Sequence, residues 1–227
     1  MSIASISAAD KSALATLARG LVEWFPSGGR EFSWRATDWD PYRLIVTELL
    51  LQRTRAETVQ RFVDNFFDTY PGWTELEKAP RNQLEVDLAP IGLQQRRAAS
   101  LQRLAGSMLE LGGIVPHDRE AIDRLPGLGQ YIANSIELLV HGVPRPLLDT
   151  NMSRVIERYV HPRKMADIRY DPWLQSAAQF LVEEDNSKMI NWAVLDFAAV
   201  VCKPRIPDCR ICPVRKNCHW PTQDKTV

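Results

Sequence analysis

The sequence predicts an all-α protein. Apolar side chains recur at helical spacing through most of the chain, as Leu14, Leu17 and Leu21 do near its start. No stretch shows the sustained alternation of apolar and polar residues that marks a half-buried strand. Glycine pairs such as Gly112-Gly113 separate the periodic segments, which indicates short turns between helices.

The expected helices follow one another along the chain. The first apolar stripe covers residues 10–25 and stops at Pro26-Ser27-Gly28-Gly29. The segment 42–54 is apolar nearly all round until Gln52, which predicts a buried helix. Asp171-Pro172 is a typical helix start and predicts a helix over 171–184. The other expected helices span residues 57–70, 74–79, 82–88, 95–111, 118–125, 130–139, 151–159 and 187–201.

The composition is that of an ordinary globular protein. Of the 227 residues, 45% are hydrophobic and 25% are charged, which excludes wholesale disorder. No apolar run reaches the roughly 18–20 residues that span a bilayer, and the N-terminus does not resemble a secretory signal. We therefore expect a cytoplasmic protein with no membrane partner. The net charge of zero mildly disfavours a nucleic-acid partner, but basic residues do gather between Cys202 and Trp220.

The four cysteines are clustered near the C-terminal end with the spacing C-x6-C-x2-C-x5-C, at Cys202, Cys209, Cys212 and Cys218. A disulfide framework would be spread through the fold, whereas tight clustering indicates a metal centre. Zinc and a [4Fe–4S] cluster both suit four thiolates. Zinc sites more often pair two C-x2-C units and only one occurs here, yet spacing alone leaves a cluster, zinc and free thiols open.

A second pattern is Leu125-Pro126-Gly127-Leu128-Gly129-Gln130-Tyr131. Its proline-glycine pair ends one helix, its glycines allow a tight turn, and a second helix follows. Backbone N–H groups at the start of that second helix would form an anion site suited to a phosphate. The same pattern also fits a plain connector between helices, and Asp149 further along also fits an ordinary N-cap.

The two helices joined by the glycine turn, which we call the hairpin, occur here together with Asp149 and the cysteine loop. This combination resembles the helix-hairpin-helix DNA glycosylases of the endonuclease III and adenine-glycosylase superfamily, over roughly residues 34–218. The resemblance implies an all-α, two-domain helix-hairpin-helix DNA glycosylase fold with a C-terminal iron–sulfur cluster loop. Residues 34–143 would form a central helical domain, and 1–33 with 144–227 a second domain that carries the cluster loop, 202–218. It also implies a [4Fe–4S] cluster on the four cysteines, catalysis by Asp149, and DNA contacts from Leu125, Gly127, Gly129, Gln130, Lys203 and Arg205.

An acid, Glu48, stands in the middle of the apolar segment 41–54. Such a position is costly unless the acid is paired, with Arg43 or Arg53 for example, or faces a cavity. The segment is similar to one that supplies a glutamate near the extruded base in adenine glycosylases and in mismatch thymine glycosylases. By the same resemblance, Arg53 falls where relatives place a residue that fills the gap left by the flipped base, and the preceding Gln52 is expected to contact DNA.

The residue type at the position of Tyr131 differs between members of the superfamily with different activities. Members that cut the strand carry a lysine at this position, which forms a Schiff base with the sugar, and a tyrosine cannot do so. Mismatch thymine glycosylases carry a tyrosine here and adenine glycosylases usually a small residue. Adenine glycosylases also continue into a further C-terminal domain, whereas this chain stops at Val227. A tyrosine simply packed in the fold is the alternative interpretation.

The resemblance therefore predicts a monofunctional, mismatch-specific DNA glycosylase of base excision repair without AP lyase activity. It would remove thymine or uracil opposite guanine, with Asp149, Glu48 and Tyr131 in catalysis. An adenine DNA glycosylase acting on A·G or A·8-oxoguanine mispairs is one alternative, and a non-catalytic DNA-binding homologue is a second. The expected partner is double-stranded DNA containing a mispaired or damaged base, and the protein is expected to be a monomer.

Overall fold

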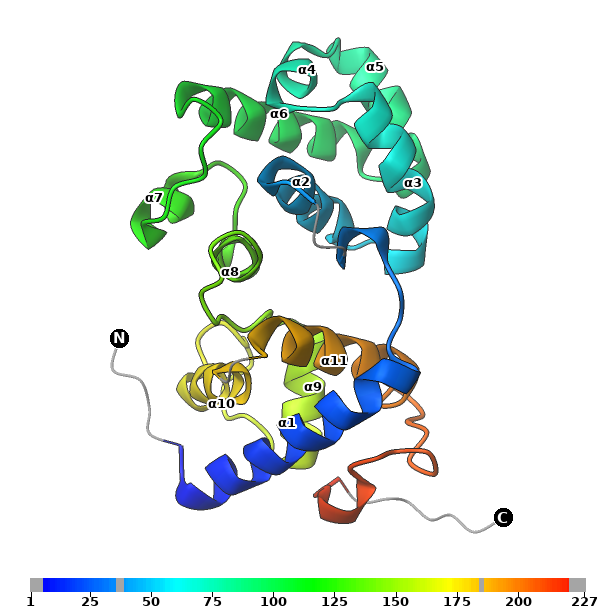
Figure 1. Cartoon of the computed structure of the whole chain (residues 1–227), viewed down its shortest axis with the longest axis vertical. Helices are drawn as coiled ribbons and strands as arrows, with labels where there is room; N and C mark the ends of the chain where they lie inside the picture. The colour runs from blue at the N-terminus through cyan, green and yellow to red at the C-terminus, as the bar shows by residue number, and fades with distance from the viewer. Residues whose placement is uncertain (1–5, 36–38, 184–185, 221–227) are drawn as a thin grey trace. The chain divides into compact units, whose positions relative to one another are not determined.

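The computed structural model describes residues 6–35, 39–183 and 186–220. Over these ranges the chain forms α-helices and single turns of 3-10 helix joined by loops, without any strand (Figure 1). The all-α prediction is therefore confirmed. No helix in the described ranges is both long and apolar enough to cross a membrane.

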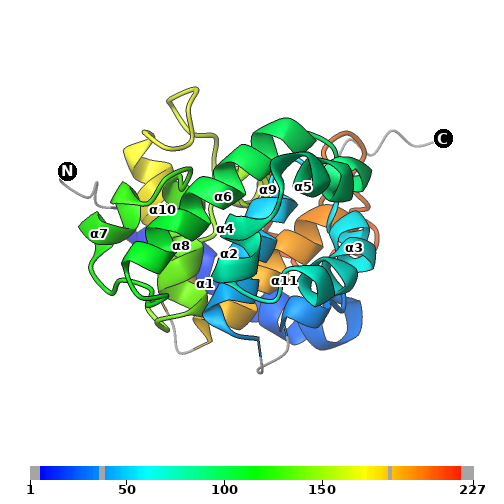
Figure 2. The same ribbon diagram turned by 90° about the horizontal axis from the view of Figure 1, so that it is seen from above.

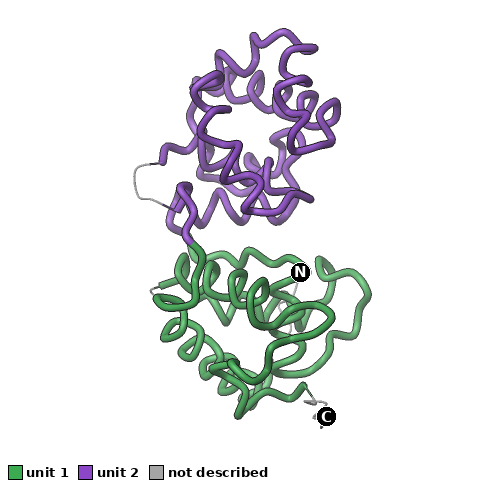
Figure 3. The backbone as a smooth tube through the Cα atoms, turned by 90° about the vertical axis from the view of Figure 1, so that its right-hand side faces the viewer, with its two compact units in different colours: residues 1–30, 143–227 green, residues 31–142 purple. Residues whose placement is uncertain are grey.

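The chain divides into two compact units (Figure 3). We call Met1–Arg30 together with Val143–Val227 the terminal unit, and Glu31–Gly142 the central unit. Each unit has a hydrophobic core of its own.

The terminal unit contains α1 (Ala8–Gly28), α9 (Thr150–Tyr159), α10 (Pro172–Val182), α11 (Ser187–Val200) and the 3-10 turn Arg215–Asn217. α1 packs on α10 and α11, and α9 packs on the same two helices. Their facing sides bury Leu14, Ile156 and Val194. Arg30 adds an ion pair to this packing, since its guanidinium bonds the fully buried carboxylate of Asp196 on α11.

The central unit contains the helices between these segments of the chain. They are α2 (Pro41–Leu51), α3 (Ala56–Thr69), α4 (Trp73–Lys78), α5 (Arg81–Leu88), α6 (Gln94–Glu110), α7 (Arg119–Arg124) and α8 (Gln130–Leu139), with 3-10 turns at Ser33–Arg35 and Ala89–Ile91. α6 packs against α4 and α5, while α2 packs on α3 and α8 (Figures 1 and 2). α2 is thereby held between the helix that follows it and the second helix of the hairpin.

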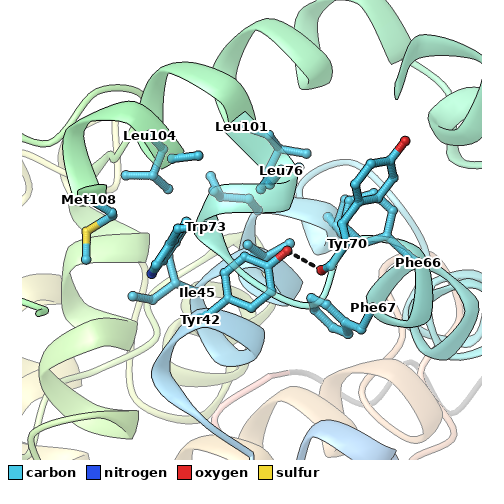
Figure 4. Packing of buried hydrophobic residues seen from close by; sticks show 14 of the residues in the cluster. Tyr42, Ile45, Phe66, Phe67, Tyr70, Trp73, Leu76, Leu101, Leu104 and Met108 are labelled. Carbon is cyan, nitrogen blue, oxygen red and sulfur yellow. Dashed lines mark hydrogen bonds between the residues drawn. The ribbon is translucent and has the colours of Figure 1, made fainter. Parts of the chain in front are cut away.

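Aromatic residues form much of the core of the central unit (Figure 4). The ring of Tyr42 stands edge-on to that of Trp73, with the ring centroids 4.7 Å apart. Its hydroxyl donates a hydrogen bond to Tyr70 O at 2.5 Å, and the hydroxyl of Tyr70 donates to the Asp87 carboxylate at 2.6 Å. These bonds satisfy the polar ends of two rings whose apolar bodies are buried.

Aspartate caps explain where four of the helices begin. Asp40, Asp118, Asp149 and Asp171 precede α2, α7, α9 and α10, and each accepts a hydrogen bond from a backbone N–H in the first turn. The first N–H groups of a helix have no partner inside the helix, so a side-chain acceptor at this position stabilises the start.

Two helix ends differ from the expectation. α1 continues through Pro26 to Gly28, because the loss of one N–H is tolerated in a last turn that the N–H of Gly29 closes on Phe25 O at 2.8 Å. α2 ends at Leu51, short of the expected residue 54. There Arg53 takes a left-handed conformation, with φ of 58°, which a right-handed helix cannot contain.

Candidate functional site

α7 and α8 are joined by a tight turn over residues 125–129, as the hairpin pattern predicts. Leu125 is buried at the end of α7, and its N–H donates to Ile122 O. Gly127 has φ of 81°, a left-handed conformation that favours glycine. Gly129 has φ of −95°, and a Cβ added there would meet no atom within 4 Å. The expected backbone freedom is thus used at Gly127, while Gly129 leaves open space in front of α8.

The first turn of α8 has the properties of an anion site. Its N-cap is Gly129, which offers no side chain to the first N–H groups, and Gln130 follows as an exposed residue. Arg119 on α7 braces the turn, since it donates to Asn134 Oδ1 at 2.8 Å and to Glu137 Oε2 at 2.5 Å, both on α8. The positive end of the helix dipole is therefore held in place beside a glycine turn.

Glu48 and Tyr131 are brought together in the central unit. Glu48 on α2 is buried, and Tyr131 in the first turn of α8 is half-buried. Burial raises the pKa of Glu48 to about 7, while a hydrogen bond from the Tyr131 hydroxyl and the charge of Arg35 act in the opposite direction. The buried Oε2 atom of Glu48 has no hydrogen-bond partner among the described residues. The carboxyl group is thus held in place yet keeps acceptor capacity for a further group.

The cation that lowers the pKa of Glu48 is Arg35. It is neither Arg43 nor Arg53, the two partners considered from the sequence. Arg35 ends the 3-10 turn Ser33–Arg35, and its guanidinium lies over the ring of Phe32 at 4.9 Å. Arg43 instead approaches Asp40, with Nε and Oδ2 3.8 Å apart. The exposed Arg53 lies beyond the end of α2.

Gln52 and Arg53 are exposed where the chain leaves α2. Arg53 lines a cavity of about 190 Å³ in the central unit together with Gln52, Leu93 and Arg96. Leu93 also has a left-handed backbone, with φ of 54°, and its side chain is 47% exposed. The structure therefore places an exposed apolar side chain beside Arg53, which is predicted to fill a base gap, and Gln52, which is predicted to contact DNA.

Asp149 lies in the terminal unit, at the start of α9. Its Oδ1 atom accepts hydrogen bonds from the N–H groups of Asn151 and Met152 at 2.9 and 2.8 Å. The N-cap interpretation is therefore correct as local geometry. Those two donors fix the position of this oxygen, and capping does not exclude a catalytic role.

A chain of hydrogen bonds leads from Asp149 to the cysteine loop. Asn151 Nδ2 donates to Asp149 Oδ2 at 2.6 Å, and Asn151 Oδ1 accepts from both terminal nitrogens of Arg154 at 3.2 and 3.1 Å. Arg154 Nε in turn donates to Cys202 O at 3.0 Å, and Nη2 donates to Ala198 O at 3.0 Å. The planar guanidinium thus ties the end of α9 that bears the acid to the end of α11 that bears the first cysteine.

The four cysteines line one largely apolar cavity of the terminal unit, with walls that include Leu17, Val155 and Phe197. Each thiol is half-buried. Burial, and then the charges of the other three cysteines, raise the pKa of Cys212 to about 11. Among the described residues, no three or more His, Cys, Asp or Glu side chains are arranged to hold one single metal ion together. A [4Fe–4S] cluster does not need such an arrangement, because each of its four thiolates bonds a different iron.

Arg158 connects the cysteine loop to α9. Its Nη1 atom lies 3.5 Å from Cys202 Sγ and donates to Lys203 O at 2.8 Å, and Nη2 donates to Pro204 O at 2.7 Å. The side chains of Lys203 and Arg205 are exposed on this loop. A buried cation therefore orders the backbone that carries two solvent-facing ones.

Comparison with known proteins places the chain in a family. Residues 46–167 match the HhH-GPD superfamily of base excision DNA repair proteins. The chain belongs to this superfamily. A thymine/uracil-DNA glycosylase of Methanothermobacter thermautotrophicus is 36% identical over 88% of this chain and 90% of its own length. A thymine-DNA glycosylase of Aeropyrum pernix is 34% identical over 95% of this chain and 98% of its own length.

The fold comparison agrees with the sequence comparison. The solved structure of a thermostable thymine-DNA glycosylase is 32% identical and has a TM-score of 0.87, covering 93% of this chain and 98% of that one. An endonuclease III bound to DNA has a TM-score of 0.80 at 22% identity, which shows a shared fold. The prediction of the helix-hairpin-helix glycosylase fold is thus confirmed for this HhH-GPD chain.

The sequence alone did not identify several residues that lie next to candidate functional residues in the structure. Arg35, Asn151, Arg154 and Leu93 were not singled out, although each contacts or neighbours a candidate residue. Asn151 and Arg154 could have been found, because Asn151 lies in the first turn after the N-cap Asp149 and Arg154 follows Asn151 at the i,i+3 spacing of one helix face. Nothing in the pattern around Arg35 or Leu93 links them to residues far along the chain.

Proposed function

We propose that this protein is a monofunctional DNA glycosylase that hydrolyses the N-glycosidic bond of thymine or uracil mispaired with guanine in double-stranded DNA. The observation that carries the proposal is the hydrogen bond between Tyr131 and the buried Glu48. It puts a phenol, and no amine, in the first turn of α8 beside a carboxyl group with spare acceptor capacity. The relatives named for thymine or uracil, at 34–36% identity, support the choice of base.

Asp149 is assigned the main role in bond cleavage. The bond between base and sugar breaks toward an oxocarbenium-like cation, as in other glycoside cleavages. A carboxylate held in place by two backbone N–H donors is suited to stabilise that cation and to orient the attacking water. The Asn151 amide fixes the second carboxylate oxygen, so the acid cannot rotate without losing a hydrogen bond.

Glu48 and Tyr131 are assigned to the base and the water. A pyrimidine leaves as an anion, so a hydrogen-bond donor near its oxygens lowers the barrier. With a pKa of about 7, Glu48 is present in both protonation states near neutral pH and is able to accept or donate a proton. Tyr131 donates to Glu48 and thereby sets the direction of the carboxyl group.

DNA binding is assigned to three parts of the chain. The turn from Leu125 through Gly127 and Gly129 to Gln130 would receive a phosphate at the start of α8. Gln52 and Arg53 would occupy the gap left by an extruded base. Lys203 and Arg205 would contact phosphates of the DNA backbone at a different place from the hairpin turn. Because this binding mode needs a single chain, the protein is proposed to act as a monomer.

A [4Fe–4S] cluster is proposed on Cys202, Cys209, Cys212 and Cys218. The support is that all four thiols line the same cavity, and a thiolate set with largely apolar walls suits such a cluster. When bound, the cluster would supply a redox-active centre that also holds the loop together, and it is given no part in the hydrolysis. The residues of the loop, with Arg158 behind it, would present Lys203 and Arg205 to DNA.

A panel of duplexes tests the proposal. Each duplex carries one T·G, U·G, A·G or A·8-oxoguanine pair or a correct pair, and base release is read as strand breakage after alkali. The expected result is release from T·G and U·G. Release from the adenine mispairs alone would identify an adenine glycosylase, and binding without release from any duplex would identify a non-catalytic homologue.

A further inference from the structure

Arg97 on α6 is a buried arginine whose hydrogen bonds are all used inside the central unit. Its side chain is 7% exposed, and a guanidinium has five N–H donors. Nε donates to Gly92 O at 2.9 Å, and Nη1 donates to Leu49 O at 2.9 Å and Leu50 O at 3.1 Å. Nη2 donates to Gln52 O at 2.7 Å and Thr54 Oγ1 at 2.6 Å.

These acceptors belong to two segments that are far apart in the sequence, the end of α2 with the loop after it and the loop before α6. One loop ends α2 and contains Gln52 to Thr54, and the other contains Gly92 just before α6. The last carbonyl groups of a helix lack partners within the helix, and Arg97 supplies partners to two of those of α2. Thr54 adds a weaker link, because its hydroxyl also lies 3.5 Å from Ile91 O.

Each of the two loops carries one residue in the left-handed region. Arg53 has φ of 58° and Leu93 has φ of 54°, and in the described part of the chain no other residue except glycine has a positive φ. Residues other than glycine rarely adopt this backbone conformation, and it persists where the surrounding structure imposes it. Arg97 bonds the carbonyl groups immediately before both residues, at Gln52 and Gly92. The strained pair therefore depends on one buried side chain.

We propose that Arg97 is a positioning residue for mispair recognition, which fixes Arg53 and Leu93 as one rigid surface around their shared cavity. The proposal rests on the proposed function, and it concerns the step in which a base leaves the duplex. Preorganised side chains lose less conformational freedom on binding than mobile ones, so the benefit is largest where the duplex must be distorted. None of the hydrogen bonds of Arg97 goes to the turn over residues 125–129, so we expect phosphate contacts at that turn to be affected less.

The test uses Arg97→Lys, which keeps the charge but has only three N–H donors for the five acceptors of Arg97. Its affinity for a T·G duplex is expected to fall about tenfold, with affinity for a paired duplex unchanged within about twofold. The fluorescence rise of 2-aminopurine placed next to the mispair, which reports unstacking, is expected to shrink in parallel. Arg103→Lys, an exposed arginine on the same helix, is the matched control and is expected to keep wild-type preference.

A double variant tells positioning from a general loss of structure. If Arg97 acts through Arg53, the affinity loss of Arg53→Ala combined with Arg97→Lys falls short of the product of the single losses. Equal losses on mispaired and paired duplexes, or strictly multiplicative losses, would overturn the proposal. If Arg97→Lys does not fold, Thr54→Val removes one acceptor and is expected to shift mispair affinity in the same direction, and no shift would count against the proposal. If wild-type protein releases no base from any duplex, the proposed function is rejected. The role of Arg97 is measured by binding alone, so the two outcomes can be distinguished.

Discussion

Asn151 holds the second carboxylate oxygen of Asp149, with Nδ2 and Oδ2 2.6 Å apart. The backbone N–H groups that start α9 hold the first oxygen. Asp149 is therefore a helix cap and an oriented carboxylate at once. This arrangement makes the two roles separable by substitution, because an amide can still cap a helix but carries no charge.

Asp149→Asn is expected to abolish base release while it leaves duplex binding nearly intact. The loss should reach about a hundredfold or more, since a neutral amide cannot stabilise the developing cation. The melting temperature should fall only slightly, because asparagine caps helices about as well as aspartate does. Single-turnover release from T·G and U·G duplexes measures the first effect and thermal unfolding the second. Turnover near the wild-type rate would leave Asp149 as a cap only.

Asn151→Ala should slow release roughly tenfold with little change in affinity for DNA, because it frees one oxygen of Asp149 and removes a partner of Arg154. The matched control is Ser153→Ala on the same helix, whose hydroxyl donates to Glu157 and makes no contact with Asp149. Single-turnover rates of both variants decide the matter. Equal rates for the two would mean that the Asn151 amide does not orient the acid.

Glu48 gives the fold a pH dependence of defined sign. Its pKa of about 7 in the folded protein is above the value of 4.5 for an exposed carboxyl, so between these values the folded state binds more protons than the unfolded state. This group's contribution to stability therefore decreases as pH rises from 4.5 to 7 and is constant above that. Glu48→Gln removes the titrating group. The free energy of unfolding of this variant, relative to that of wild type, should therefore increase by roughly 3 kcal/mol between pH 4.5 and pH 8. Urea unfolding at pH 5 and pH 8 measures it, and a difference that does not change with pH would contradict it.

The helices could be predicted because their causes are local. Apolar spacing places the buried faces, and Asp171-Pro172 marks a helix start that the structure reproduces. The end of α2 could not be predicted, because its last carbonyl groups are bonded by Arg97, which lies more than forty residues further along the chain. Likewise Tyr131 was identified as an isolated position, but its contact with Glu48 exists only after α8 packs on α2.

The purified protein is expected to be yellow-brown, with about four iron atoms per chain. Cys212→Ser should lose the colour and most of the iron, because Cys212 lines the cavity with the other three cysteines. Iron content and visible absorbance measure both. A colourless and active protein with stoichiometric zinc would contradict the assignment.

Wild-type protein should leave an intact strand at the abasic site until alkali or heat is applied. The phenol of Tyr131 has no amine, so no imine with the sugar can form there, and borohydride should trap no covalent complex. Tyr131→Phe also has no amine and is the matched control for loss of the hydroxyl. Efficient trapping of wild-type protein would mean that another lysine reaches the sugar, and the monofunctional assignment would be wrong.

Tyr131→Lys places an amine at the start of α8, and it should gain strand cleavage and borohydride trapping. The substrate is a duplex with a preformed abasic site opposite guanine, so that base release plays no part in the readout. The neighbouring Glu48 would pair with the new lysine and keep it protonated, whereas only the neutral amine attacks the sugar. Combining Tyr131→Lys with Glu48→Gln removes that charge, lowers the pKa of the lysine and should raise the trapped fraction above that of the single variant. If both variants fold and bind the duplex but neither is trapped, the side chain at this position does not face the sugar.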